Sequence, residues 1–371
     1  MPTSGTRQHR RRSSALHRCA WVILLIITTY LSAYQAFSQR ITKDARFGRL
    51  VENIQLSNLN ITAIAQDSKG FLWVGTMDGL NRFDGYDFKI YRNIEDDTTS
   101  IVKNRVETIY EDSDSVLWVS TLNSGLQYYN RRADAFVRVP EYSQRYCHVF
   151  RITEDNQHNL WIGGAFNEQA FVAVRDHKTH QWQKFLLFRA AEGIYSILQI
   201  SENEFWLGSQ SNGLLRWNKK TNAIEQHYLH DPNNSNSLPG NDIRKIVEDT
   251  HGNLWIATHD GGLSKFNVKK NEYTNYSVDS SDGLPTLPNN TIRCMINDNR
   301  YLWMATENGG LSRLDIATGE LMNFLYDKSN PNSIINNSIW SVCKDRQGRI
   351  WVGSFAKGLC VLDMLEDKLP N

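Results

Sequence analysis

The sequence predicts an all-β protein that folds as a seven-bladed β-propeller, with four antiparallel strands in each blade. A short tryptophan-containing segment, GFLWVGT at residues 70–76, recurs along the chain. Successive copies lie 43 to 49 residues apart, a period typical of propeller blades. Each copy divides into short β-branched and aromatic runs separated by turn residues, as strands and hairpins do. The copies centre on Trp73, Trp118, Trp161, Trp206, Trp255, Trp303 and Trp351.

The copy at residues 241–276 illustrates the four strands. An apolar run ends at Glu248, and a turn containing Gly252 follows, where glycine supplies the positive φ of a tight turn. Residues 254–258 then form a second strand, and residues 263–266 alternate apolar and polar side chains like a half-buried third strand. Residues 273–276 repeat that alternation. We therefore expect four strands in a blade, and no segment has a helical period long enough to matter.

The side chain two residues after each tryptophan is small. Positions i and i+2 share one face of a strand, so a large ring lies beside a reserved gap in every copy. We expect each indole to pack into space kept clear between neighbouring sheets. The small residues are Gly75, Ser120, Gly163, Gly208, Ala257, Ala305 and Gly353.

Residues 1–38 are expected to lie outside the propeller. A basic leader precedes an uncharged, mostly apolar run at residues 19–34, and small residues at Ala36 and Ser38 suit an export peptidase. We interpret the segment as a signal peptide cleaved after Ser38, because the run is short for a membrane span. The alternative is an uncleaved anchor, which would tether the protein to the inner membrane and make this segment its only membrane contact. Either reading predicts an exported, periplasmic protein.

The chain after the leader is expected to close the ring. The seventh copy supplies three strands before Asp363, so its fourth strand must come from elsewhere. Phe47 and Leu50 have the spacing of the apolar anchors in other fourth strands. We therefore expect an N-terminal strand to complete the last blade, which removes exposed sheet edges. The predicted propeller spans residues 44–366, with a tail at 367–371.

Irregular copies and cysteines add smaller expectations. The third copy has residues 165–169 where others have a short glycine turn, so we expect a longer loop there, and the fourth copy loses a residue before Trp206. Cys294 and Cys343 occupy nearly equivalent positions in successive copies. We expect buried free thiols, with a disulfide between these two as the alternative.

Composition and motifs argue against catalysis and nucleic-acid binding. The formal net charge is +1, which gives no electrostatic footprint for nucleic acid. The sequence contains no zinc-protease, nucleophile-elbow, phosphate-loop or EF-hand motif. We therefore predict no catalytic residues, no metal site and no cofactor.

The candidate ligand-binding residues lie at the start of each innermost strand and in the loop between the second and third strands. These positions vary between copies while the surrounding frame repeats. Trp340 stands out as an aromatic residue beside arginine and aspartate, a combination suited to stacking on a sugar ring. Its alternative role is a plug in the central channel. The candidates are Arg105, Glu107, His148, Tyr195, Asp242, Arg244, Arg293 and Trp340, with Asn167 and His259 from the loops.

The clearest copy resembles a known repeat. The pattern ED-x-x-GNLWIAT-x-x-GGL at residues 248–263, preceded by Asn-Ser-Leu-Pro-x-Asn, is similar to the two-component regulator propeller repeat. That resemblance covers roughly residues 44–366 in seven copies. It implies the periplasmic sensor region of a hybrid histidine kinase, or of a membrane-bound diguanylate cyclase.

The resemblance implies an exported, ligand-sensing propeller, which in many relatives reads oligosaccharides. Full-length relatives continue with a second propeller and a cytoplasmic output module, and no kinase or cyclase motif is present in this sequence. Any kinase or cyclase activity would therefore lie in a missing C-terminal module. The implied partners are a small-molecule ligand and either a second copy of the chain or a second propeller. Two alternatives to a sensor remain open, a protein-interaction scaffold and a propeller lyase or hydrolase.

Overall fold

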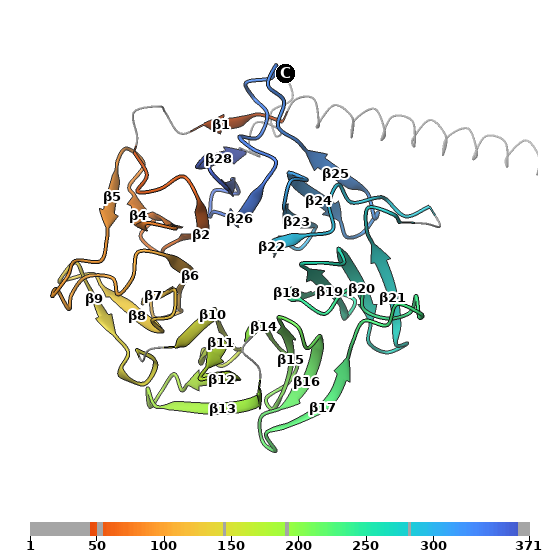
Figure 1. Cartoon of the computed structure of the whole chain (residues 1–371), viewed down its shortest axis with the longest axis horizontal. Coiled ribbons are helices and arrows are strands. Elements are labelled where there is room, and N and C mark those ends of the chain that lie inside the picture. Colours follow the sequence, from red (N-terminus) through yellow and green to blue (C-terminus); the bar gives the residue numbers. More distant parts are fainter. Residues whose placement is uncertain (1–44, 50–54, 144–145, 190–192, 281–282, 363–371) are drawn as a thin grey trace, which may run out of the picture. The chain divides into compact units, whose positions relative to one another are not determined.

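The computed structural model describes residues 45–49, 55–143, 146–189, 193–280 and 283–362. Within the compact unit that begins at Arg46, these residues form seven four-stranded antiparallel sheets arranged around a central axis (Figure 1). The prediction of an all-β, seven-bladed propeller is thus confirmed. The one helical element in these ranges is a short 3₁₀ turn, η1 (Pro140–Tyr142), so no described helix has the length and apolar character to cross a membrane.

The first four blades follow the chain in order, each running outward from its innermost strand. Blade 1 contains β2 (Ile61–Gln66), β3 (Leu72–Thr76), β4 (Gly79–Phe83) and β5 (Phe88–Tyr91). Blade 2 contains β6 (Val106–Glu111), β7 (Leu117–Thr121), β8 (Leu126–Asn130) and β9 (Ala135–Arg138). Blade 3 contains β10 (Cys147–Glu154), β11 (Leu160–Phe166), β12 (Gln169–Arg175) and β13 (Trp182–Arg189). Blade 4 contains β14 (Ile194–Gln199), β15 (Glu204–Ser209), β16 (Leu214–Asn218) and β17 (Ala223–Tyr228).

The last three blades continue the same order, except that blade 7 takes one strand from the other end of the chain. Blade 5 contains β18 (Ile243–Glu248), β19 (Asn253–Thr258), β20 (Leu263–Asn267) and β21 (Glu272–Tyr276). Blade 6 contains β22 (Ile292–Asn297), β23 (Tyr301–Thr306), β24 (Leu311–Asp315) and β25 (Leu321–Phe324). Blade 7 contains β26 (Ile339–Lys344), β27 (Ile350–Ser354), β28 (Leu359–Leu362) and β1 (Phe47–Arg49).

The ring is closed by β1, as the sequence predicts. This strand pairs antiparallel with β28, with Phe47 opposite Leu362 and Arg49 opposite Cys360. Phe47 is 3% exposed and its ring packs edge-on against Phe324 of blade 6, with centroids 5.6 Å apart. The strand therefore completes the sheet of blade 7 and also packs against blade 6. Leu50, the leader at 1–38 and the tail at 367–371 lie outside the described residues.

The tryptophans pack between neighbouring sheets. Trp73 of blade 1 lies edge-on to Tyr129 of blade 2 at 4.9 Å, and it belongs to a buried cluster that includes Val106 and Phe136 of blade 2. The small residue beside the indole has a second purpose. A Cβ added to Gly75 would lie 2.7 Å from Val106 Cγ1, so the reserved gap is filled by the next blade's inner strand and not by the indole. The expected interlocking is correct, but the group that enters the gap is different.

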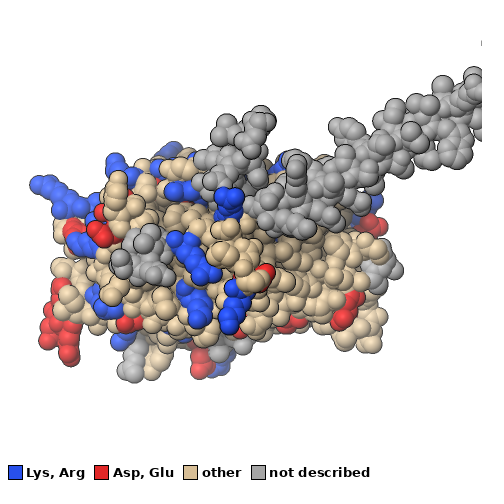
Figure 2. All heavy atoms as spheres, turned by 90° about the horizontal axis from the view of Figure 1, so that it is seen from above, with Lys and Arg blue, Asp and Glu red and all other residues tan. Residues whose placement is uncertain are grey.

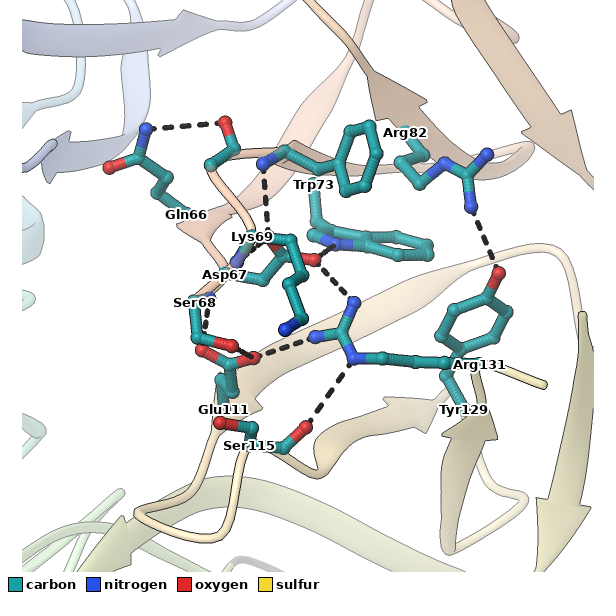
Figure 3. Close-up of polar contacts among 12 residues, drawn as sticks. Gln66, Asp67, Ser68, Lys69, Trp73, Arg82, Glu111, Ser115, Tyr129 and Arg131 are labelled. Carbon is teal, nitrogen blue, oxygen red and sulfur yellow. Dashed lines mark hydrogen bonds and ion pairs between the residues drawn. The ribbon is translucent and has the colours of Figure 1, made fainter.

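Six of the seven repeat indoles are also held by an aspartate five or six residues earlier in the chain. In blade 1 the Nε1–H of Trp73 donates to Asp67 Oδ2 at 2.8 Å, and Asp67 Oδ1 accepts from the backbone of Lys69 and Phe71 (Figure 3). The carboxylate thus shapes the turn and satisfies a buried donor. Six blades contain this pair, and in blade 4 Ser201 stands at the corresponding position. The pairs are Asp67–Trp73, Asp112–Trp118, Asp155–Trp161, Asp249–Trp255, Asp298–Trp303 and Asp345–Trp351.

The same carboxylate links blade 1 to blade 2. Arg131 of blade 2 donates to Asp67 Oδ2 at 2.7 Å and to Glu111 Oε1 at 2.6 Å. Glu111 in turn accepts the Ser68 hydroxyl at 2.9 Å, so the turn of one blade is bonded to the inner strand of the next (Figure 3). Because Asp67 is fully buried, these charge-assisted bonds act where water does not compete with them.

The expected long loop in blade 3 is instead a longer hairpin. β11 and β12 each extend to seven residues, and only Asn167 and Glu168 connect them. Both residues have positive φ, 48° and 60°, the conformation of a two-residue type I′ turn. The extra residues therefore lengthen the paired strands and leave the loop short. The described cysteines, Cys147, Cys294, Cys343 and Cys360, are free thiols.

Charged side chains are scattered over the side of the ring, between larger areas of other residues. Figure 2 views the unit from the side on which β1 lies and shows lysine and arginine side chains grouped near the middle of the view. Aspartate and glutamate lie around the periphery of the same view. Both signs of charge therefore occur on this surface, in keeping with the net charge of +1.

We predict that Phe47→Ala lowers the free energy of unfolding by about 3 to 5 kcal/mol, because it empties a buried aromatic site on the closing strand. Arg49→Ala is the matched control, since Arg49 lies on the same strand and is exposed. Urea unfolding followed by tryptophan fluorescence measures both variants. Equal stability of the two variants would contradict closure by β1.

We also predict that Asp67→Ala costs about 2 to 4 kcal/mol of stability, because it leaves the Trp73 N–H buried without an acceptor and removes a partner of Arg131. Asp87→Ala, on the exposed turn of the same blade, is expected to change stability by less than about 0.5 kcal/mol. Chemical denaturation of both proteins tests the difference. A small effect of Asp67→Ala would show that the carboxylate contributes little to stability.

Candidate ligand-binding channel

The innermost strands of the seven blades surround a central channel with a cavity volume of about 870 Å³. Side chains from β2, β6, β10, β14, β18, β22 and β26 line it, so every blade contributes to one shared site. The channel is therefore where the repeat architecture brings together residues that lie hundreds of positions apart in sequence.

A β-bulge near the start of every inner strand sets which side chains face the channel. The register between first and second strands shifts at the same point in all seven blades, for example between Ile61 and Ala63 and between Ile339 and Ser341. A bulge places two residues of one strand opposite one residue of its partner. Two successive residues, in place of alternate ones, therefore line the cavity in six of the seven blades.

The bulged residues form one ring, which we call the mouth ring. Its members differ in size and charge, unlike the isoleucine or valine that precedes each of them. Five of them are sequence candidates, namely Glu107, Tyr195, Arg244, Arg293 and Trp340. The complete mouth ring is Thr62, Glu107, Phe150, Tyr195, Arg244, Arg293 and Trp340.

Trp340 is half-buried between neighbours from two blades. Its ring stacks on Phe355 at 4.9 Å, and the guanidinium of Arg293 lies 4.7 Å from its centroid. The indole Nε1–H is buried and has no hydrogen-bond partner among the described residues. An unsatisfied buried donor is costly, so this N–H is a group that a ligand acceptor could satisfy.

Blades 3, 4 and 5 contribute two aromatic rings and a second arginine to the mouth ring. Phe150 and Tyr195 stack with centroids 4.3 Å apart and planes inclined by 10°. The Arg244 guanidinium lies 4.5 Å from the Tyr195 centroid, within cation–π range. Burial raises the pKa of Tyr195 to about 12, so its hydroxyl stays neutral and can both donate and accept hydrogen bonds.

The arginines near the mouth are paired with carboxylates. Arg244 Nη2 lies 2.6 Å from Asp242 Oδ2, and Arg293 Nε donates to Glu307 Oε2 at 2.9 Å. Arg105 Nε lies 2.8 Å from Glu107 Oε1. Burial raises the pKa of Glu107, although Arg105 opposes that effect. The mouth is therefore polar and close to charge-balanced.

The remaining candidates lie near the channel or away from it. His259 is half-buried with its Nδ1 3.9 Å from Asp242 Oδ2, and His148 packs on Phe150 with centroids 5.6 Å apart. Burial lowers the pKa of both histidines, and Arg244 adds to the effect on His259. Asn167 lies in the two-residue turn of blade 3. Six of the ten candidates line the cavity, and His148, Asn167, Asp242 and His259 do not.

A second ring, which we call the inner ring, lies one residue further along each strand. Every member pairs with the small residue that follows a repeat tryptophan by two positions. Sequence analysis missed this ring, although counting one residue past the mouth candidates would have found it. The inner ring is Ala63, Thr108, Arg151, Ser196, Lys245, Cys294 and Ser341.

The two cations of the inner ring are the unusual members. Arg151 and Lys245 are half-buried and line the cavity, where the other five blades present small or short side chains. Burial, reinforced by Arg151, lowers the pKa of Lys245 to about 7. Burial also lowers the pKa of Arg151. The channel interior thus differs in chemistry from its mouth.

Among the described residues, no group of three His, Cys, Asp or Glu side chains is arranged to hold a metal ion. The acidic residues that line the cavity are already engaged. Glu111 accepts from Ser68 and Arg131, and Asp345 accepts from Trp351 and Arg349. The described arrangement is suited to binding by stacking and hydrogen bonding.

Family comparison matches four segments of the chain. The model described as the two component regulator propeller aligns with residues 55–78, 100–123, 237–260 and 333–356. These segments contain the inner and second strands of blades 1, 2, 5 and 7, including the mouth and inner rings of those blades. The match bears out the repeat identified from the sequence.

Known proteins resemble this chain over a part of their own length. A histidine kinase of Formosa agariphila is 61% identical over 46 residues, which are 12% of this chain and 3% of that protein. The extracellular domain of a hybrid two component system from B. thetaiotaomicron has a TM-score of 0.70 at 26% identity, covering 86% of this chain and 42% of that one. The extracellular domain of a one component system from the same organism has a TM-score of 0.66 at 21% identity, covering 85% and 39%, and shows the fold alone.

The depressed pKa of Lys245 predicts a pH-dependent stability. Between about pH 7 and 10.5 the unfolded lysine carries a proton that the folded one lacks, so stability rises with pH across that window. Lys245→Met removes this dependence. We therefore expect the variant to be more stable than the wild type near pH 7, and the gap to narrow toward pH 10.

Thermal unfolding at several pH values in a low-salt buffer measures this gap. Lys270→Met, at a 67% exposed side chain, is the control and should follow the wild type throughout. A constant difference between wild type and Lys245→Met from pH 7 to 10 would contradict the predicted titration.

Proposed function

We propose that this chain, four segments of which match the two component regulator propeller model, is an exported sensor propeller that binds a small molecule at the mouth of its channel. The ligand class we propose is an oligosaccharide or a similar polyhydroxylated molecule. The observation that carries this proposal is the mouth ring, where aromatic faces and hydrogen-bonding groups from seven blades converge on one cavity.

The aromatic residues favour a ligand with apolar faces. Trp340 and the stacked pair of Phe150 and Tyr195 offer ring surfaces in the same cavity. The C–H faces of a sugar ring stack on such surfaces, and a cavity of about 870 Å³ falls within the range of small-molecule pockets. Burying these faces against a ligand would provide the apolar part of its binding energy.

The polar residues favour a neutral ligand at the mouth. Arg105, Arg244 and Arg293 keep N–H groups near the cavity while Glu107, Asp242 and Glu307 balance their charge. A charge-balanced set of donors and acceptors suits hydroxyl groups, each of which donates and accepts. The unpartnered Nε1–H of Trp340 adds one donor that a ligand oxygen would satisfy.

Export is supported by two independent features. The resembling domain of the hybrid two component system from B. thetaiotaomicron is described as extracellular, and residues 1–38 have the pattern of a signal peptide. We propose a periplasmic location, with tethering to the inner membrane if the N-terminal segment is not cleaved.

The signalling output is part of the proposal. The relatives named above belong to signalling systems and are longer than this chain, which covers 42% and 39% of the two solved domains. We propose that ligand binding is passed to a histidine kinase module, with a diguanylate cyclase as the alternative output. Association with a second copy or a second propeller would carry the signal.

We expect the melting temperature of the purified chain to rise with concentration of its oligosaccharide ligand, because a ligand that binds the native state stabilises it by about 2.7 kcal/mol at 100 times its Kd. Thermal-shift measurement against a panel of neutral oligosaccharides tests this. Trp340→Ala and Arg244→Ala should abolish the rise.

Tyr86→Ala is the control, because Tyr86 is 83% exposed and does not line the cavity. A rise that survives in Trp340→Ala would place the ligand elsewhere. A cooperative melt that no oligosaccharide moves would favour the interaction scaffold, and turnover of any panel member would favour the lyase or hydrolase.

A further inference from the structure

The cations that line the channel differ in whether they have an acidic partner. At the mouth and at the opposite end, each cation that lines the cavity has an acidic neighbour. Arg105, Arg244 and Arg293 pair at the mouth. Lys344 lies 3.4 Å from Asp298, and Arg346 lies 3.9 Å from Glu111. The inner ring between these two levels does not follow this rule.

Arg151 and Lys245 have no ion pair and no hydrogen-bond partner in the part of the chain that the structure describes. The Arg151 Nε atom is buried, and the cavity is lined by both side chains. The two residues come from blades 3 and 5, so they flank blade 4 on either side. Two unpaired cations in a confined space repel one another and are incompletely hydrated, which is unfavourable without a counter-charge.

The described part of the chain offers no free counter-charge at the cavity. The carboxylates that line the cavity are Glu107, Glu111 and Asp345, and each is already bonded, to Arg105, Arg131 and Arg349 respectively. The other inner-ring side chains at the cavity are neutral and small, which leaves room beside the two cations. Buried charges in proteins are normally paired, so a partner is expected from beyond the described residues, and a bound anion would supply it.

We propose that the inner ring is a binding site for a small oxyanion, a carboxylate or sulfate-like group, held between the Arg151 guanidinium and the Lys245 ammonium. Arg151 matches the planar geometry of an oxyanion with paired N–H donors, and Lys245 adds a point charge. This site lies one residue deeper than the mouth ring and does not depend on the sugar-binding role of Trp340.

The oxyanion has two sources with the same chemistry. It is either a free inorganic anion or the acidic group of a larger ligand, and the second source rests on the proposed function of the mouth. Inorganic sulfate is the probe for the site itself, because its charge does not change between pH 6 and 8. A glucuronate-containing disaccharide compared with its neutral glucose counterpart then separates the two sources.

Isothermal titration calorimetry of the full chain with sodium sulfate, against sodium chloride at matched ionic strength, tests the proposal. We expect wild type to bind sulfate, and Arg151→Met and Lys245→Met each to bind about tenfold more weakly or less, as loss of a charge-assisted hydrogen bond implies. Lys344→Met is the matched control, because Lys344 lines the same cavity but is paired with Asp298.

The variants carry an internal test of folding. Replacing an unpaired buried cation with an apolar side chain removes a destabilising group, so Lys245→Met should melt no lower than wild type in sulfate-free buffer near pH 7. Added sulfate should raise the melting temperature of wild type and of Lys344→Met, and leave Lys245→Met unchanged. This reversal distinguishes lost binding from lost folding.

The affinity for sulfate should also depend on pH. With the pKa of Lys245 near 7, wild type is expected to bind about tenfold more tightly at pH 6 than at pH 8. The other ionisable groups that line the cavity are Glu107, Tyr110 and Glu111 on β6, Arg151 on β10, Tyr195 on β14, Arg244 on β18, Arg293 and Cys294 on β22, Cys343 and Lys344 on β26, and Arg105, Asp345 and Arg346 next to these strands. Lys245→Met should abolish the dependence, and Cys294→Ser should retain it.

Three results would overturn the proposal. They are failure of wild type to bind sulfate more tightly than chloride, undiminished binding by both Arg151→Met and Lys245→Met, and an equal loss in Lys344→Met, which would mean unspecific charge attraction. Success with sulfate combined with tighter binding of the glucuronate disaccharide than of its neutral counterpart would identify the acidic group of a larger ligand as the source. Failure of every neutral sugar to bind would leave the sulfate result standing.

Discussion

The structure depends on one repeated contact, a buried indole that belongs to one blade and packs on the next. In blade 1, Trp73 is fixed from behind by Asp67 and lies against Tyr129 of blade 2. Burying roughly 200 Å² of ring at roughly 25 cal/mol per Å² stabilises each interface by on the order of 5 kcal/mol at most. No blade can bury its indole alone, so the ring must close, and β1 supplies the last sheet with its outer strand.

The same construction frees the channel for specialisation. The indoles lie on the second strands, and the inner strands pack on the next blade through the residue before each mouth residue, such as Val106 beside Gly75. The mouth positions themselves are therefore free to vary. The bulge at the start of each inner strand then turns two neighbouring residues toward the cavity in nearly every blade. Two chemistries follow from these two rings: a charge-balanced aromatic mouth, and a deeper level where Arg151 and Lys245 have no ion-pair partner among the described residues.

Sequence reasoning found the mouth and missed the inner ring for a physical reason. Strand alternation implies that residues i and i+2 share a face, so Arg244 was expected in the channel and Lys245 was not. The bulge breaks that alternation. It is a feature of backbone pairing, and no residue type in the sequence predicts it. Asn167 shows the converse case, since the irregular segment predicted a longer loop, whereas two positive-φ residues form a tight turn there.

The sequence alone determined the number of blades, their strands and the closing role of Phe47. The reason is that a buried indole with a small residue two positions later is a pattern that recurs once in each blade. Tertiary structure alone decided what those blades present to the channel. Pairing of charges depends on distances across the ring, such as Arg293 with Glu307, and these follow from how seven sheets are arranged. The lack of a described partner for Arg151 and Lys245 is likewise a property of the assembled ring, since in the sequence each residue resembles an ordinary surface cation.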